Sequence, residues 1–447
     1  MHFEEHDIIA APATATGGAI AVIRVSGEGA VECCDRIFRG RTTLATAQAY
    51  TVHYGEIVDD GRVLDDVLVT VFRAPHSYTG EDGVEISTHG SGYIVSEVLA
   101  LLMRHGARMA QPGEFSVRAF LAGKMDLSQA EAVADMIASS SRASHSLAST
   151  QMRGGYSSSL ADLRTKLLNV ASLLELELDF SEEEVEFANR GQLAEMLDSA
   201  VREIEHLCES FRLGNAIKEG VATVIVGEPN VGKSTLLNRL VGEERAMTSD
   251  IAGTTRDTIE AMCNIDGVTF RFVDTAGLRD TDDRLEQMGI DRTHRAIEQA
   301  QIVVQMSEAG TESERETVTI GEGQTLIRVV NKIDKYARVE MESADVVYMS
   351  ARSGEGIEEL RRRLRAVIDT DAVYAGATVV SNSRHYEALN RALEALLHAR
   401  EALTMGLSGE LLSEELRDVL RHLGEITGEV TSQDILNNIF SKFCIGK

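Results

Sequence analysis

The chain has 447 residues, which is too many for one ordinary domain, so we expect two or three. Its formal net charge of −27 disfavours broad non-specific binding to a nucleic-acid backbone, although a local basic patch or a basic partner that carries the nucleic acid remains open. Five cysteines without a C-x-x-C spacing disfavour a zinc knuckle, and their odd number fits a reducing compartment.

The first residues predict no targeting segment. Met1–Glu5 is acidic, unlike a signal peptide, and the apolar run 19–25, interrupted by Arg24, is far too short to span a membrane. We therefore expect a cytoplasmic protein without integral membrane association.

Short β-type runs separated by glycine turns fill residues 1–120. The runs 19–25 and 67–72 predict strands, and the segment 92–105 has a helical pattern. This first part of the chain is therefore expected to form an α/β or α+β domain.

Helical patterns dominate the next part of the chain and return near its end. In 121–215, leucines recur at three- and four-residue steps, and Ser181–Glu184 has the form of a capping box, with a functional carboxylate cluster as the alternative. Similar stripes occupy 378–447. The simplest architecture inserts an α/β domain, residues 216–377, into a helical domain whose halves are 121–215 and 378–447.

Alternating strands and helices between 221 and 368 predict a doubly wound, mainly parallel sheet. Its first buried strand, 221–226, leads into Gly227–Ser234, a complete G-x-x-x-x-G-K-S phosphate loop followed by a helix. Backbone N–H groups of such a loop surround phosphates, and the helix dipole adds to their binding. We expect Lys233 to reach the β- and γ-phosphates and Ser234 to ligate magnesium.

A second motif selects the base. Asn331-Lys332-Ile333-Asp334 follows the buried strand 326–330, and a carboxylate there accepts both the ring N–H and the exocyclic amine of guanine. Adenine lacks this donor pair, and such a mismatch costs a factor of roughly 10⁴. Ser350-Ala351-Arg352 resembles the backbone guanine contact of small GTPases, although it is a weak signal alone.

Two further segments predict sensors of the γ-phosphate. Asp274-Thr275-Ala276-Gly277 places Asp274 to hold magnesium through water and Gly277 to donate a backbone N–H. The segment 253–257 supplies a threonine for magnesium, for which we choose Thr255. Leu278 stands where Ras-like enzymes have a water-orienting glutamine, and no arginine finger is identifiable, so hydrolysis needs another water-positioning group and another positive charge.

Several further motifs lie along the whole chain. They are the phosphate loop with Pro229-Asn230, 250–257, 274–279, 111–115, 118–121, 124–132 and 443–447. Together they resemble the bacterial MnmE (TrmE) family of tRNA-modification GTPases. The tail Phe443–Lys447 and the N-terminal motifs are not shared with other GTPases.

The resemblance implies a homodimer joined through the N-terminal domains and a heterotetrameric complex with the flavoprotein MnmG. It implies modification of the wobble uridine C5 of certain tRNAs, to an aminomethyl or carboxymethylaminomethyl group. The one-carbon donor would be 5-formyltetrahydrofolate or another one-carbon tetrahydrofolate bound by the N-terminal domain. The residues that match the family's folate contacts are Arg24, Glu81, Lys124 and Lys447. Without the family match, Arg24 and Lys124 would be read as ordinary solvated charges.

The resemblance also fills both catalytic gaps. A potassium ion would take the place of an arginine finger, with the Asn230 side chain and the loop atoms of Ser249, Ile251 and Thr254 as ligands. Ser249 replaces the threonine expected there, but a backbone carbonyl serves equally well. Potassium-dependent pairing of the GTPase domains would drive hydrolysis, and Glu286 matches the glutamate that orients the attacking water. Without the match, Glu286 would be an exposed helix charge.

The catalytic set is therefore Glu286, Lys233 and Asn230. The predicted nucleotide contacts are Asn230, Val231, Gly232, Lys233, Ser234, Thr235, Ser249, Asp250, Ile251, Ala252, Gly253, Thr254, Thr255, Asp274, Thr275, Ala276, Gly277, Asn331, Lys332, Asp334, Ser350, Ala351 and Arg352.

Two alternatives remain. Cys444 is fourth from the end, as in a prenylation box, but Gly446 is not aliphatic and no polybasic segment precedes it, so we expect a thiol that is either near the folate pocket or buried and inert. The second alternative is a regulatory GTPase that associates with the ribosome or its RNA. Such proteins usually append a basic domain, whereas the flanks here are helical and acidic.

Overall fold

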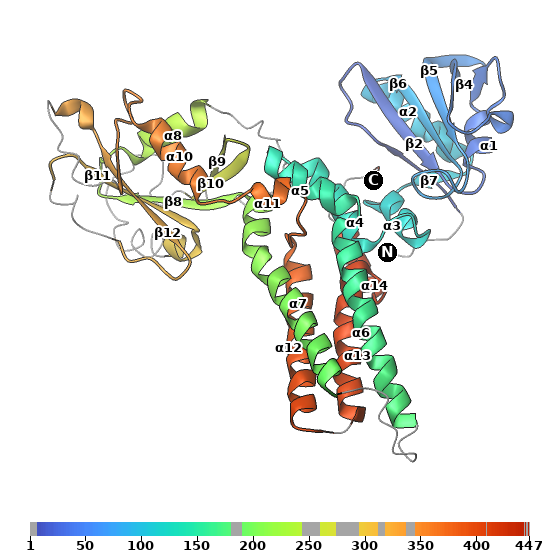
Figure 1. The fold of residues 1–447 in the computed structure, drawn as a ribbon. Helices are drawn as coiled ribbons and strands as arrows, with labels where there is room; N and C mark the ends of the chain where they lie inside the picture. Colours follow the sequence, from blue (N-terminus) through green and yellow to red (C-terminus); the bar gives the residue numbers. More distant parts are fainter. Residues whose placement is uncertain are drawn as a thin grey trace. The chain divides into compact units, whose positions relative to one another are not determined.

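The computed structural model describes residues 7–179, 190–243, 260–273, 295–311, 318–336, 345–407, 409–441, 443 and 446 (Figure 1). The chain forms two compact units, the first made of residues 1–134 with 424–447 and the second of residues 135–423. No helix among the described residues is long and apolar enough to cross a bilayer.

The first unit contains a seven-stranded sheet in the order β3-β4-β5-β6-β2-β1-β7, antiparallel except for the parallel pair β1–β7. Alternating residues of β2, such as Ile23 and Val25, point into the main core, as expected for a strand with one fully buried face. The strands are β1 Ile8–Pro12, β2 Ile20–Ser26, β3 Phe38–Gly40, β4 Thr51–Asp59, β5 Arg62–Phe72, β6 Gly83–His89 and β7 Ala107–Met109.

Helices cover this sheet unequally. The helices α1 (Ala30–Asp35) and α2 (Gly92–Arg104) contribute to the core on one face. On the other face, α3 (Glu114–Leu121) packs Phe115 against Ile9 and Ala11 of β1. The rest of that second face keeps several large apolar side chains of β2, β4 and β5 exposed.

The C-terminal helix α14 (Gln433–Phe440) packs on α3 and on the start of α4 (Leu127–Ala138). A glycine makes this close packing possible. Gly113 has φ +70°, and a Cβ there would lie 2.6 Å from the Phe440 carbonyl oxygen. Every other residue type would have to push α14 away.

Long helices form one part of the second unit. Alanine and leucine repeat at three- and four-residue steps on α7 and α12, which lets these two helices pack closely side by side (Figure 1). Phe211 and Tyr386 stack across this pair with ring centroids 4.3 Å apart. The helices are α5 Arg142–Met152, α6 Gly155–Asp179, α7 Arg190–Glu219, α12 Ser383–Thr404 and α13 Gly409–Thr427. The predicted capping box at Ser181 lies outside the described residues.

The other part of the second unit is a six-stranded sheet in the order β13-β12-β11-β8-β10-β9. All neighbouring pairs are parallel except β9–β10, so the predicted doubly wound, mainly parallel sheet is confirmed. Its elements are β8 Val221–Gly227, α8 Lys233–Glu243, β9 Glu260–Ile265, β10 Val268–Val273, β11 Ile302–Glu308, β12 Thr325–Asn331, the 3₁₀ turn η4 Ile333–Lys335, β13 Val346–Tyr348, α10 Ile357–Ala366 and α11 Asp371–Tyr374.

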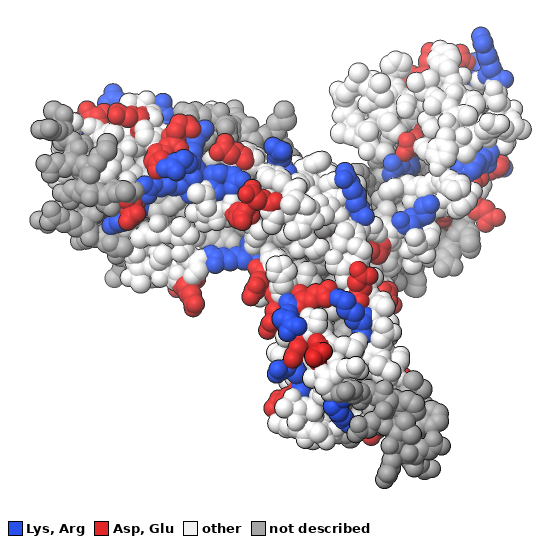
Figure 2. Space-filling view, viewed as in Figure 1, with Lys and Arg blue, Asp and Glu red and all other residues white. Residues whose placement is uncertain are grey.

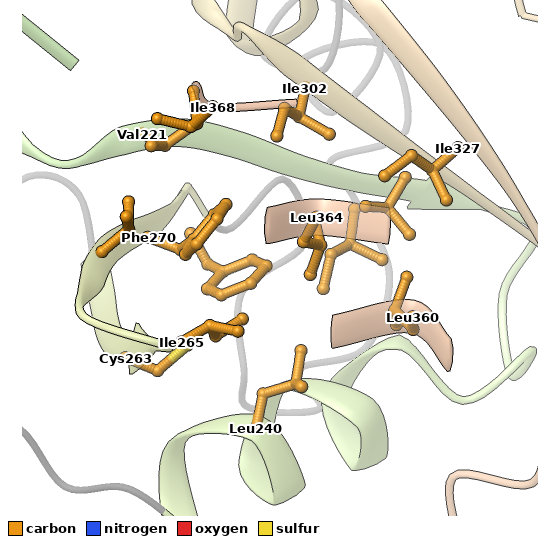
Figure 3. Packing of buried hydrophobic residues seen from close by; sticks show 14 of the residues in the cluster. Val221, Leu240, Cys263, Ile265, Phe270, Ile302, Ile327, Leu360, Leu364 and Ile368 are labelled. Carbon is orange, nitrogen blue, oxygen red and sulfur yellow. The ribbon is translucent and has the colours of Figure 1, made fainter. Parts of the chain in front are cut away.

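The core under this sheet is not made by the sheet and its own helices alone. Figure 3 shows strand residues such as Phe270 and Ile302 facing Leu240 of α8 and Leu364 of α10. The same apolar cluster includes Ala143 and Leu147 of α5 and Ala216 and Ile217 of α7. The Ala143 N–H also donates to the Gly267 carbonyl oxygen at 3.0 Å, at the turn between β9 and β10. Helical segments therefore complete the core of the α/β part.

Candidate nucleotide-binding site

The phosphate loop follows β8 and needs two of its glycines for steric reasons. Gly227 has φ +147°, and a Cβ there would lie 2.1 Å from the Met306 carbonyl oxygen. Gly232 has φ +104°, and its Cβ would lie 2.4 Å from the Asn331 amide nitrogen. Neighbouring strand ends therefore press against the outer side of the loop, and only glycine fits at these two points.

Lys233 lies over the phosphate loop. Its ammonium group donates to the carbonyl oxygens of Gly227 at 2.8 Å and Glu228 at 2.9 Å. Ser234 and Thr235 are exposed on the first turn of α8, the end of a helix at which its dipole favours anions. Asn230 is also exposed and has φ +66°, so its amide is presented from a turn of the loop.

Asn331 ties three loops together. It is 2% exposed, its amide nitrogen donates to the Val231 carbonyl at 2.7 Å, and its amide oxygen accepts the Ala351 N–H at 2.9 Å. A buried amide with both ends bonded fixes its neighbours in position. The Asn331 side chain thus joins the phosphate loop to the loop that begins at Ser350.

Glu308 also lies at this site, although no sequence motif includes it. It ends β11 opposite Asn331, accepts a hydrogen bond from Lys332 at 2.5 Å and one from Lys335 at 3.0 Å. These hydrogen bonds, first from Lys332 and then from Lys335, lower the pKa of the Glu308 carboxyl. Its position at the carboxyl end of a parallel strand was the available signal, because ligand-binding groups gather at that edge.

Asp334 is exposed on the turn η4, just beyond the buried Asn331. Lys332 reaches this turn through a left-handed conformation, with φ +66°. Because β12 and β13 are adjacent and parallel, the turn lies at the same sheet edge as the segment Ser350–Arg352. The structure therefore places Asp334 and the Ser350–Arg352 loop at one edge of the sheet, and their contacts with guanine stay predictions.

The loop after β13 is curled and well bonded. Ser350 is fully buried, its N–H donates to the Glu355 carbonyl at 2.9 Å, and its hydroxyl accepts the Ser353 N–H at 3.1 Å. From α8, the guanidinium of Arg239 donates to the carbonyls of Ala351 and Arg352. Sequence patterns gave no indication of this Arg239 contact.

Several predicted residues lie outside the described residues, and their roles stay predictions. They are Ser249, Asp250, Ile251, Ala252, Gly253, Thr254, Thr255, Asp274, Thr275, Ala276, Gly277 and Glu286 in the second unit, and Cys444 and Lys447 at the end of the chain.

A second candidate site lies in the first unit, at the predicted folate contact Arg24. A cavity of about 110 Å³ is lined by Arg24, Ser26, Phe72, Tyr78, Thr79 and Glu85, among others. The Arg24 guanidinium donates to Glu85 at 2.9 and 3.0 Å, lies 5.1 Å from the Tyr78 ring centre, and donates to the Gly446 carbonyl at 3.4 Å. The end of the chain therefore contacts a wall of this cavity.

Glu81 is joined to the same cavity through Ser26, whose hydroxyl donates to it at 2.8 Å. Glu81 also accepts from Arg118 at 3.1 Å. Lys124 is not among the residues that line the cavity, and its exposed ammonium donates to the Pro75 carbonyl at 2.8 Å. The structure thus places Arg24 and Glu81 close to one cavity, and the folate contacts of Arg24, Glu81 and Lys124 all stay predictions.

A largely buried network of ion pairs lies next to this cavity and includes Glu81. Arg118 is 7% exposed and pairs with Asp7, Glu81 and Glu114, and Glu114 has no exposed surface. Burial alone would raise the pKa of Glu114, but hydrogen bonds from Arg108 and from the Gln111 N–H lower it below the usual range. The network joins the segment before β1 to α3.

Comparisons with known proteins agree along the whole chain. Two family models match, the GTP-binding protein TrmE N-terminus over residues 8–124 and the MnmE helical domain over residues 127–444. A relative from Cytophaga hutchinsonii named tRNA modification GTPase MnmE is 49% identical over 451 residues, which covers 99% of this chain and 98% of the relative. One of the same name from Bacteroides thetaiotaomicron is 48% identical and covers 99% of both chains.

Among solved structures, a variant of Aquifex aeolicus Era bound to GDP and AlF4⁻ matches 39% of this chain and 66% of its own, with 25% identity and a TM-score of 0.26. A TM-score of that size supports no conclusion about this chain. The family models and the near-complete coverage of the relatives are sufficient, and they show that the chain belongs to the MnmE (TrmE) family of tRNA modification GTPases.

Proposed function

We propose that this protein hydrolyses GTP in the cytoplasm and uses the hydrolysis in the modification of tRNA, together with the flavoprotein MnmG. The observation that carries the proposal is the arrangement around Asn331. One buried side chain joins the phosphate loop, the turn with Asp334 and the loop with Ala351. The loops that would bind the phosphates and the base of a nucleotide are therefore linked to one another through Asn331.

The described residues divide the work of binding. Lys233 and the backbone N–H groups at the start of α8 would bind the phosphates, and the exposed Asp334 would accept the two guanine donors. Ser234 suits a magnesium ion, because its hydroxyl is exposed beside Lys233 and a hard cation prefers oxygen ligands. Magnesium would neutralise phosphate charge; Thr255 and, through water, Asp274 are its other proposed partners.

The catalytic groups are proposed from the family resemblance. The exposed amide of Asn230 fits a potassium ligand, with Ser249, Ile251 and Thr254 as the others. Such an ion would stabilise charge between the separating phosphates. Glu286 would orient the attacking water. Equal hydrolysis rates in potassium and sodium buffers would remove the potassium assignment and leave the GTP site intact.

The cavity beside Arg24 supports a one-carbon tetrahydrofolate as the ligand of the first unit. Phe72 and Tyr78 supply aromatic surface for a flat ring, and Arg24 supplies a cation that is already oriented by Glu85. Glu81, Lys124 and Lys447 complete the proposed contact set. The contact between Arg24 and Gly446 supports a role for the end of the chain at this site.

An exposed apolar face supports a homodimer through the first unit. Tyr54 of β4 lies opposite Leu68 of β5, and their exposed fractions are 68% and 49%. Val52 and Ile20 are also exposed on the same side of the sheet, at 58% and 65%. Apolar groups gathered on one sheet face are typical of association surfaces.

We propose that tRNA is bound through the complex. Figure 2 shows Lys and Arg side chains interleaved with Asp and Glu on the visible surface. The arginines of α10 illustrate this mixing, since Arg362 and Arg363 both pair with Glu359. Carboxylates so close to the arginines offset the attraction for a phosphate backbone.

Reconstitution with MnmG and tRNA tests the function. Modified wobble uridine should form with GTP, and should fail to form with a non-hydrolysable analogue or with Glu286→Ala. Recovery of ribosomal subunits without the flavoprotein from a pull-down would instead support the regulatory GTPase.

A further inference from the structure

The loop from Ser350 to Gly354 is held from two sides. Asn331 binds the Ala351 N–H from the side of β12. From the side of α8, the Arg239 guanidinium donates to three successive carbonyl oxygens, those of Ala351 at 3.2 Å, Arg352 at 2.8 Å and Ser353 at 3.5 Å. Three successive carbonyls can meet one group only if the chain curls around it.

A glycine makes room for this contact. Gly354 has φ +93°, and a Cβ there would lie 2.9 Å from the terminal Nη2 of Arg239. The curl is also closed from within, because the Gly354 N–H donates to the Ser350 carbonyl at 2.9 Å. The planar guanidinium can serve several acceptors in fixed directions, which a lysine ammonium on a flexible stem does less well.

The carbonyl contacts set the direction of a backbone donor. In a trans peptide the C=O and N–H groups point in opposite directions. When the Ala351 carbonyl points at Arg239, the Arg352 N–H of the same peptide therefore points away from α8. Asp334, on the neighbouring turn, lies at the same edge of the sheet.

We propose that Arg239 is a positioning residue for guanine recognition. It holds the Ala351–Ser353 loop so that the loop's backbone donates a hydrogen bond to the 6-oxo group of the base, while Asp334 reads the ring N–H and the amine. Arg239 itself does not touch the nucleotide. The inference rests on the proposed binding of GTP, and it also explains how α8 links phosphate binding at its first turn to base binding.

Nucleotide analogues separate this role from general support. In 6-thio-GDP the 6-oxygen is replaced by a poorer acceptor while the ring N–H and the amine remain, whereas IDP lacks only the amine. Dissociation constants of GDP, 6-thio-GDP and IDP would be measured on the full chain as wild type, as Arg239→Met and as Arg362→Met. Arg362 is a surface arginine 74% exposed in its pair with Glu359, and serves as the control.

Arg239→Met should weaken GDP binding about 3- to 10-fold, the range of one backbone hydrogen bond. The preference for GDP over 6-thio-GDP should shrink by a similar factor, and the preference for GDP over IDP should stay unchanged. Arg362→Met should change neither ratio. Should Arg239→Met fail to fold, Arg239→Lys, which keeps the charge but loses the planar fork, provides the same measurement.

An equal loss of affinity for all three nucleotides would overturn the inference. If Arg239 only stabilised the fold of the loop, the ratios between the three dissociation constants would not change. Unchanged affinities in the Arg239 variants would overturn it as well. Failure of the proposed function is distinguishable, since wild-type protein would then bind GDP no more tightly than ADP.

Discussion

The two candidate sites are built in different ways. The nucleotide site is made of consecutive residues at the ends of parallel strands, and its buried tie, Asn331, bonds to backbone groups at both ends. The cavity in the first unit is made of side chains from distant segments, joined by ion pairs such as Arg24–Glu85 and Arg118–Glu81. One site depends on backbone shape, the other on a set of charges that must all be present.

This difference predicts how each site fails. The nucleotide site, which is formed mainly by backbone groups, should stay folded when one side chain is removed and should lose only the contact that this side chain makes. A network of buried charges should respond as a unit, because removal of one partner leaves another charge unpaired.

The largest effect is expected at Lys233. Lys233→Ala removes the cation that lies over the phosphate loop, so GTP hydrolysis should fall about 100-fold or more. Phosphate release would be measured at saturating GTP. Binding of 5-formyltetrahydrofolate to the same variant should be unchanged, and a parallel loss would show that the two sites are not built separately.

The second largest effect is expected for base specificity. In Asp334→Asn the carboxylate becomes an amide with a donor, which suits the 2-oxo group of xanthine and opposes the guanine amine. The preference for GTP over XTP should fall about 100-fold, less than the factor of roughly 10⁴ for a fully mismatched buried group, because Asp334 lies on an exposed turn. Competition between the two nucleotides measures it, and a preference that survives would assign base recognition elsewhere.

A smaller effect is expected at Arg24. Arg24→Met keeps most of the stem and removes the cation, so the affinity for 5-formyltetrahydrofolate should fall about 10-fold, the usual size for a hydrogen bond to a charged group. Isothermal titration would give the dissociation constant. Arg104→Met, at an exposed pair with Asp59, is the matched control and should bind as wild type does. Equal binding by both variants would move the ligand away from the cavity.

The last expected effect appears only on acidification and concerns the buried network. The pKa of Glu114 is lower in the folded protein than in the unfolded chain, so its contribution to stability is present above the unfolded value and is lost as pH falls through the folded one. Urea unfolding of wild type should therefore show stability declining on acidification below about pH 4.5, the ordinary pKa of a glutamate carboxyl. In Glu114→Gln this part of the slope should be missing; an identical slope would exclude Glu114 as its source.

The sequence predicted the contiguous parts of this protein well, for physical reasons. The strand that became β8 is a run of apolar residues, and the phosphate loop after it has glycines where neighbouring backbone leaves no room for a Cβ. Such features are local, so residue order contains them.

The parts that could not be predicted depend on long-range contacts. Arg239 sits on a helix whose apolar stripe gave no reason to single it out, and its partners lie more than one hundred residues further along the chain. Glu81 was selected by resemblance, but nothing in the sequence indicates that it pairs with Arg118. The ion network exists only after the fold has brought the segment before β1 next to α3.

The shared core of the second unit has a consequence for protein engineering. A fragment cut at residues 216–377 would take Ala216 and Ile217 with it but leave Ala143 and Leu147 of α5 behind. It would also lose the N–H that binds the Gly267 carbonyl at the turn between β9 and β10. Such a fragment would expose a new apolar surface patch, and it is expected to aggregate or to unfold at a lower temperature. The fragment that keeps this core intact is therefore discontinuous in sequence and must include α5.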